Sequence, residues 1–231
     1  MSVPTAALRL QQILLTALLL GLFAVLGTGL VAFTFDNTHE RIAANERAAL
    51  LRNLHVLIPP ERHDNDLFND VIAVTAPELL GSAEPTAAYR ARKDGWPVAL
   101  VIAATAPDGY SGPIRLLVGI NADGTLAGVR VVNHRETPGL GDAIEASRSD
   151  WILGFDGRSL DDPKESLWAV KRDGGHFDQF TGATITPRAV VNAVKKALLY
   201  FQRNSDRLFA EPSLREAPAP QPAAAPSTGA Q

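Results

Sequence analysis

The sequence predicts an α+β protein, in which one N-terminal transmembrane helix precedes a domain with a mostly antiparallel sheet flanked by helices. Three observations lead to this fold class. An uncharged apolar run occupies residues 10–35. Apolar, β-branched runs separated by tight-turn sequences follow between residues 96 and 134. Apolar residues then recur at helical spacing over 187–204. This order lacks the regular alternation of strand and helix that is typical of a parallel sheet.

The run at 10–35 is long enough to cross a membrane, since a helix needs about 20 residues to span the hydrocarbon core. A cleaved signal peptide has a shorter apolar stretch, of roughly 7–15 residues, and a cleavage site with small residues. The end of this run, Val31-Ala32-Phe33, offers no convincing site of that kind. We therefore expect an uncleaved signal anchor. The alternative is a buried helix of a soluble protein.

The charges beside the run predict its orientation. Arg9 precedes it with no acidic residue nearby, whereas residues 36–47 carry charges of both signs. Positive charge next to a span favours the cytoplasmic side. We therefore expect residues 1–9 in the cytoplasm of a bacterium, the span in the inner membrane, and the remaining chain in the periplasm. An oxidising compartment suits a chain without cysteine.

The chain beyond the span divides into three parts. Residues 36–87 are expected to be a helical stalk and connector, with helix-forming residues over 36–57 and Pro59-Pro60 ending that helix. Residues 88–208 form the domain. Its strands are predicted at 96–105, 113–121, 125–134 and 166–171, and its helices at 141–148 and 187–204. The Asp123-Gly124 turn joins the second and third strands as a hairpin. The Pro- and Ala-rich tail at 209–231 is expected to be disordered.

Composition and charge exclude several classes of function. Hydrophobic residues make up 46% and charged residues 20% of the 231 residues, so the chain as a whole is not disordered. A net charge of −3 gives no electrostatic case for nucleic acid. The absence of cysteine removes disulfides, thiolate zinc sites, iron–sulfur clusters and a cysteine nucleophile. The five histidines show no metal-ligand spacing, so no metal site is predicted.

The first candidate site is the segment DQFTGATITP at 178–187, which leads into the last helix. We expect Thr186 to cap that helix and Pro187 to occupy its first position. Small residues at 182 and 183 leave space around the hydroxyl of Thr184. A helix start offers free backbone N–H groups and the positive end of a dipole, which together suit a phosphate. The alternative is an ordinary glycine turn followed by a helix cap.

The second candidate site is the segment HRETPGLGD at 134–142. A strand ends here in a loop with Pro-Gly and a second glycine, and small residues let a backbone approach a flat ligand closely. Glu136 and Thr137 can form hydrogen bonds with the polar edges of a ring. The alternative is a simple connection between a strand and a helix.

These segments together resemble a known family. The pattern D-x-x-[ST]-G-A-T, present as Asp178, Thr181 and the run 182–184, is similar to the recognition motif for covalent flavinylation. The segments 109–120, 134–145, 149–152 and 178–197, with the N-terminal span, resemble the G subunit of the Rnf (Rsx) ion-translocating electron-transport complex. The resemblance extends to about residue 205. The C subunit of the Na⁺-translocating NADH:quinone reductase shares the TGAT and ETPGLG elements and is the nearest alternative.

The resemblance implies a periplasmic FMN-binding domain, with FMN joined through its phosphate to the hydroxyl of Thr184 in a phosphodiester. Thr186 is the competing attachment site. Asp178 would serve recognition by the flavin transferase, which uses FAD and Mg²⁺ in this family. The other implied cofactor-binding residues shape the turn (Thr181, Gly182, Ala183), offer backbone N–H groups to the phosphate (Ile185, Thr186) or lie along the flavin (Glu136, Thr137, Pro138, Gly139, Leu140).

The resemblance also implies a membrane-anchored electron carrier that is not catalytic alone. The Rnf complex moves electrons between NADH and ferredoxin and couples this transfer to ion translocation. Expected partners are the other membrane subunits of the complex, membrane lipid and, during maturation, the flavin transferase. Two other classes stay open: a non-redox periplasmic binding or assembly module, and a free-standing enzyme. For the latter the sequence shows no arrangement of general acid and base, so no catalytic residue is predicted.

Overall fold

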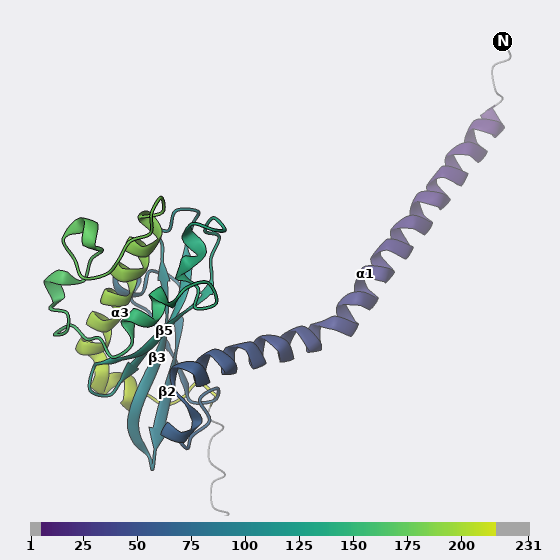
Figure 1. Ribbon diagram of the computed structural model, residues 1–231. Helices are drawn as coiled ribbons and strands as arrows, with labels where there is room; N and C mark the ends of the chain where they lie inside the picture. Colours follow the sequence, from purple (N-terminus) through teal and green to yellow (C-terminus); the bar gives the residue numbers. More distant parts are fainter. Residues whose placement is uncertain (1–5, 216–231) are drawn as a thin grey trace, which may run out of the picture. The chain divides into compact units, whose positions relative to one another are not determined.

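The computed structural model describes residues 6–215, and the chain divides after Leu50 into two compact units. The first unit contains most of helix α1 (Ala6–Leu57) (Figure 1). Residues 10–35 are all exposed, and the helix from Leu10 is long and apolar enough to cross a membrane. None of its most apolar window is buried, so α1 is not the core helix of a soluble domain. Residues 1–5 of the predicted cytoplasmic end and 216–231 of the predicted tail lie outside the described residues.

Helix α1 ends in the second unit, where its last turn packs against two strands. These are β4 (Ile114–Asn121) and β5 (Leu126–Asn133), in which Gly119 and Gly128 are paired. A Cβ added at Gly119 would lie 3.3 Å from Leu57 Cβ, and one added at Gly128 would lie 3.1 Å from Leu57 Cδ2. The two glycines therefore make the space in which the buried Leu57 side chain sits.

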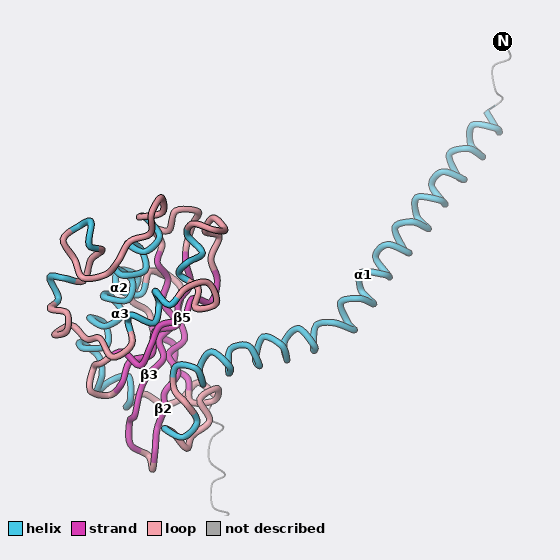
Figure 2. The backbone as a smooth tube through the Cα atoms, viewed as in Figure 1, coloured by secondary structure: helices cyan, strands magenta, loops and turns pink. Residues whose placement is uncertain are grey.

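The second unit contains, within the described residues, one five-stranded sheet whose strand order follows the chain. Strands β1 (Val71–Val74), β2 (Thr86–Lys93) and β3 (Trp96–Ala106) precede β4 and β5, and all neighbours are antiparallel. Helix α3 (Ile185–Ala210) packs against β3 and β4, and the short α2 (Pro77–Leu80) contacts α3 (Figure 2). The predicted α+β class, with an antiparallel sheet and helices, is confirmed.

The core lies between the sheet and α3. The apolar face predicted for the last helix is buried there against alternate residues of the central strands, and this burial is the main apolar driving force for the domain. The residues that meet are Leu100, Ile102, Leu116, Val118 and Ile120 from the sheet and Val190, Val194, Ala197, Leu198 and Phe201 from the helix.

Four short 3₁₀ helices connect β5 to α3. They are η2 (Gly141–Ile144), η3 (Asp150–Phe155), η4 (Glu165–Leu167) and η5 (Lys171–Asp173). An aromatic cluster holds this long connection in place: the ring centroids of Phe155 and Phe177 lie 4.6 Å apart, and those of Trp168 and Phe177 lie 5.0 Å apart.

Two of the predicted elements in this connection were wrong. The segment 166–171 is not a strand, because its apolar side chains serve the aromatic cluster: Trp168 is buried and donates its indole N–H to the carbonyl of Pro163 at 3.0 Å. Within the segment 166–171, only Val170 pairs with another residue as in a sheet, in an isolated β-bridge with Phe177. The helix predicted at 141–148 is limited to the single 3₁₀ turn η2, since residue 145 is already extended.

The sheet also begins earlier than predicted, and the chain stays ordered later. Strands β1 and β2 include part of the segment 58–87, which had no recognisable pattern. Residues 209–215, assigned to the tail, include the end of α3 and a stretch that pairs with β1: Leu214 N donates to Val71 O at 2.8 Å, and Val71 N donates to Ser213 Oγ at 3.1 Å.

A buried arginine joins these unexpected parts. Arg90 on β2 is 2% exposed and lies 2.5 Å from Asp70. Its guanidinium also donates to the carbonyls of Leu208, at 3.2 Å, and Glu211. Carbonyls at the C-terminal end of a helix carry partial negative charge. Arg90 therefore neutralises two groups: the end of α3 and the carboxylate of Asp70.

We expect Arg90→Met to lower the free energy of unfolding by about 3 kcal/mol, because the substitution removes the donor to two carbonyls at the end of α3 and one of the donors to the partly buried Asp70 carboxylate. Chemical denaturation of the full chain in detergent, followed by tryptophan fluorescence, measures the change. The matched control is Arg203→Ala on the exposed side of α3, which should change stability by less than about 0.5 kcal/mol. Equal stability of the two variants would contradict this role for Arg90.

Candidate functional site

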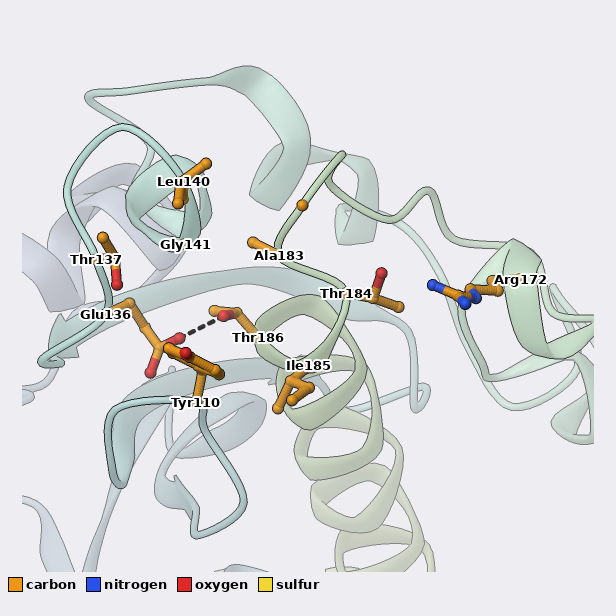
Figure 3. Close-up of a pocket in the computed structure, with 11 residues that line it drawn as sticks. Tyr110, Glu136, Thr137, Leu140, Gly141, Arg172, Ala183, Thr184, Ile185 and Thr186 are labelled. Carbon is orange, nitrogen blue, oxygen red and sulfur yellow. Dashed lines mark hydrogen bonds between the residues drawn. The ribbon is translucent and has the colours of Figure 1, made fainter.

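A cavity of about 510 Å³ lies between the loop after β5, the start of α3 and the turn η5 (Figure 3). Its volume falls within the range of about 300–1,000 Å³ that is typical of sites for small molecules and cofactors. Its lining comes from four segments far apart in the sequence: Tyr110; Glu136, Thr137, Leu140 and Gly141; Arg172; and Gly182, Ala183, Thr184, Ile185 and Thr186.

The start of α3 forms one wall of the cavity. The helix begins at Ile185, and Thr184 is its N-cap residue, with no hydrogen bond from its side chain to the helix backbone. The prediction that Thr186 caps the helix and Pro187 is its first residue was wrong by two positions. Because α3 starts earlier, the backbone N–H groups of Ile185 and Thr186 belong to its first turn, where no helical acceptor exists.

Gly182 sets the direction in which the chain enters the helix. Its φ is +81°, a left-handed conformation that favours glycine. The turn around it is closed by a hydrogen bond from Ala183 N to Phe180 O at 3.2 Å. Thr184 therefore follows a tight turn and lies half-buried at the cavity, with its hydroxyl left out of helix capping.

A buried carboxylate joins three of the cavity's segments. Glu136 is 4% exposed and accepts a hydrogen bond from Ser111 N at 2.9 Å. Its other oxygen accepts from the hydroxyl of Thr186, which is 1% exposed. A Cβ added at Gly141 would lie 2.9 Å from the Glu136 Cβ, so this contact requires glycine. Glu136 thereby fixes the loop after β5 to both the β3–β4 loop and helix α3.

The loop that carries Glu136 is held by its own backbone. Leu140 N and Gly141 N donate to Thr137 O at 3.1 and 3.0 Å. Glu136 N donates to His134 Nδ1 at 3.0 Å, so His134 carries its proton on Nε2, 2.6 Å from a Glu145 oxygen. Hydrogen bonds from His134 first, and then from Ser147, lower the pKa of Glu145.

Two ion pairs join the turn η5 to residues on either side of the TGAT segment. Lys171 lies 2.6 Å from Asp178, the acid of the motif, and Asp173 lies 2.6 Å from Arg188 on α3. The hydrogen bond from Arg188 is the main cause that lowers the pKa of Asp173. Arg172, between these two paired residues, lines the cavity.

The structure brings most of the predicted site residues to one cavity. Eight of them line it: Glu136, Thr137, Leu140, Gly182, Ala183, Thr184, Ile185 and Thr186. Four do not, namely Pro138, Gly139, Thr181 and Asp178. Gly139 instead donates its backbone N–H to Asp142 at 2.8 Å, and the Asp178 side chain is 69% exposed in its pair with Lys171.

Sequence reasoning missed three lining residues. Tyr110 lies in the segment 109–120, which contributed to the family resemblance but was given no part in the site. Gly141 was recognised as the second glycine of the loop, where a small residue allows close approach to a ligand, but it was not named among the cofactor-binding residues. Arg172 carried no signal at all, because its place depends on ion pairs made by its two neighbours.

Comparison with known proteins shows which families the chain resembles. Residues 1–57 match the family described as the RnfG N-terminal region, and residues 109–199 match the family described as the FMN-binding domain. A protein of Pseudomonas aeruginosa strain PAO1, named as the G subunit of an ion-translocating oxidoreductase complex, is 56% identical over 87% of this chain and 94% of its own length. Proteins with the same name from Pseudoalteromonas atlantica and Shewanella loihica are 51% identical (86% and 93% covered) and 50% identical (88% and 96% covered).

Glu136 and Thr186 should act as one unit in stability. We expect Glu136→Gln and Thr186→Val each to lower the free energy of unfolding by about 1–3 kcal/mol. The first replaces the charged acceptor by a neutral amide, and the second removes the donor to a buried carboxylate oxygen. A double-mutant cycle should give a coupling energy of about 0.5–3 kcal/mol. The control cycle pairs Glu136→Gln with Thr181→Val, at an exposed threonine, and should be additive. If the effects of Glu136→Gln and Thr186→Val are additive, the hydrogen bond between these residues does not contribute to the free energy of unfolding.

Proposed function

Because the chain belongs to the family of G subunits of ion-translocating oxidoreductase complexes and contains an FMN-binding domain, we propose that it relays electrons through an FMN esterified to Thr184. FMN accepts and releases one or two electrons, so the redox chemistry comes from the cofactor and this protein is not catalytic alone. The complex would pass electrons between NADH and ferredoxin and couple the transfer to ion translocation.

The match of residues 1–57 to the RnfG N-terminal region favours this assignment over the C subunit of the Na⁺-translocating NADH:quinone reductase. The names of the similar proteins point the same way.

The contrast between two threonine hydroxyls supports Thr184 as the attachment point. Thr186 is buried, and its hydroxyl already donates to the buried Glu136. Thr184 is half-buried at the cavity, and its hydroxyl makes no capping hydrogen bond. A hydroxyl must be reached by a second substrate before it can be esterified, and of the two only Thr184 meets this requirement.

The cavity fits a phosphorylated flavin at both ends. Near Thr184, the free N–H groups of Ile185 and Thr186 and the positive end of the α3 dipole favour a phosphate. Away from this end, two large side chains that line the cavity are exposed: Tyr110 at 68% and Leu140 at 47%. A flat apolar ring placed against them would remove this surface from water.

Attachment would use FAD as the donor, with the flavin transferase and Mg²⁺. The Thr184 hydroxyl oxygen bonds to the phosphorus of the FMN half, the pyrophosphate bond breaks, AMP leaves, and the hydroxyl proton is released. Asp178 would contribute to recognition by the transferase. It is exposed enough for a second protein to reach, and its ion pair with Lys171 fixes its position beside the turn.

Helix α1 would anchor the domain to the membrane, with residues 1–9 in the cytoplasm and the flavin domain in the periplasm. Anchoring makes encounters with the other membrane subunits effectively intramolecular, which raises their local concentration. A covalent bond suits a compartment that offers little free FMN, since dissociation there would be permanent loss. The anchor also places membrane lipid among the partners.

The attachment site is tested by intact-protein mass spectrometry after co-expression with the flavin transferase. We expect the wild-type chain to gain about 440 Da, the mass of FMN less water. Thr184→Ala should gain nothing, and Thr184→Ser should retain the gain. Ser166→Ala, at an exposed hydroxyl in η4 outside the motif, serves as the control and should remain flavinylated. Added mass on Thr184→Ala would move the attachment to another hydroxyl, and wild-type protein without added mass would favour a non-redox assembly module.

The topology is tested by labelling, because the chain has no cysteine of its own. We expect a membrane-impermeant maleimide to label Ser166→Cys, in the exposed η4 turn, in spheroplasts with an intact inner membrane. The matched variant Ser2→Cys should react only after the membrane is permeabilised. The opposite pattern would reverse the proposed orientation.

A further inference from the structure

We propose that Arg172 is the residue that recognises the phosphate of the flavin, and that it makes the site selective for phosphorylated flavins over riboflavin. This inference rests on the proposed function, because it assigns a role at the end of the cavity where Thr184 would carry the cofactor.

The first observation is a difference between Arg172 and the charged residues around it. Lys171 is paired with Asp178, and Asp173 is paired with Arg188 through two hydrogen bonds of 2.6 and 2.8 Å. The Arg172 guanidinium makes no hydrogen bond or ion pair among the residues 6–215 that the structure describes. Of the three consecutive charged residues 171–173, Arg172 is therefore the one whose guanidinium can pair with a ligand.

The second observation is where this charge lies. Figure 3 shows the Arg172 side chain extending from η5 toward Thr184, at the start of α3. The backbone beneath it is fixed: Arg172 N donates to Gln179 Oε1 at 3.1 Å, and Lys171 N donates to Phe177 O at 2.7 Å. The guanidinium is therefore carried by a turn that is hydrogen-bonded to the segment before the TGAT run, and it extends toward Thr184, the proposed attachment point.

The third observation is the charge balance of the cavity. Among residues 6–215, Arg172 and Glu136 are the only charged residues that line it. Glu136 is buried, and both its oxygens are engaged, with Ser111 N and the Thr186 hydroxyl. A phosphate at Thr184 would therefore meet the helix N-terminus on one side and a guanidinium on the other. A guanidinium can donate two parallel hydrogen bonds to phosphate oxygens, a geometry that an ammonium group does not reproduce.

Riboflavin has the same ring and ribityl chain but no phosphate. A residue that only packs against the flavin would affect both ligands, whereas a phosphate-binding residue affects FMN alone. The comparison between the two ligands therefore separates recognition of the phosphate from packing.

The experiment uses the full chain in detergent, with Thr184→Ala as background so that flavin binds without forming the ester. Affinities for FMN and riboflavin are measured by quenching of flavin fluorescence at low ionic strength. Adding Arg172→Ala should weaken FMN binding by about five-fold or more and leave riboflavin binding unchanged within about two-fold. The loss should shrink as salt is added, since the side chain is exposed.

Two further variants sharpen the result. Arg172→Lys should restore only part of the FMN affinity, because it keeps the charge but not the paired donors. Arg203→Ala removes an exposed arginine that lies on α3, outside the cavity lining, and should leave both affinities unchanged. Equal losses for FMN and riboflavin, or no loss for FMN, would overturn the proposal.

If the Thr184→Ala protein binds neither flavin, the flavinylated chain decides the matter. The ³¹P resonance of the phosphodiester should shift in Arg172→Ala and stay in place in Arg203→Ala; identical spectra would overturn the role of Arg172. The two hypotheses fail separately. Wild-type protein without added mass contradicts attachment at Thr184, whereas flavinylated protein whose phosphate is insensitive to Arg172 contradicts only this inference.

Discussion

The candidate site depends on one hydrogen-bonded group, the buried Glu136 carboxylate with the Ser111 N–H and the Thr186 hydroxyl. A carboxylate without donors would be costly at this depth, so the three segments that meet here are fixed relative to one another. The same group engages the hydroxyl of Thr186 and leaves the half-buried Thr184 hydroxyl at the cavity. In the proposed function, one hydroxyl therefore serves stability and the other, two positions away, carries the cofactor.

The fold could be predicted where local patterns carry the information. Three of the strands and the last helix follow from apolar periodicity and from turns such as Asp123-Gly124, which act over a few residues. Strands β1 and β2 could not be recognised, because β2 is rich in Ala and Arg and its stability depends on the distant Asp70 and on the end of α3. The segment 166–171 misled for the opposite reason: its apolar residues fill an aromatic cluster, and a local pattern cannot distinguish this from a sheet.

The candidate site was likewise predictable where local patterns define it and not where contacts between distant residues do. Glycines and threonines at a helix start indicate a phosphate site from sequence alone, and the family resemblance adds the cofactor. The N-cap was placed two residues late, because the sequence does not reveal that Thr186 turns inward to Glu136. Arg172 could not be found either. Its position results from two ion pairs made by its neighbours, and such pairs between distant residues have no signature in a single sequence.

The pairing of Ser213 and Leu214 with β1 has a consequence for behaviour in solution. β1 is the outermost strand on its side of the sheet, and an outer strand with free N–H and C=O groups can template the addition of another chain. Here the carbonyl of Val71 accepts from Leu214 N, and its N–H donates to the Ser213 hydroxyl as well as to Asn69 O. Ser213 and Leu214 therefore cover the edge of the sheet at this position and hinder the addition of another chain, which matters most for proteins confined to one bilayer.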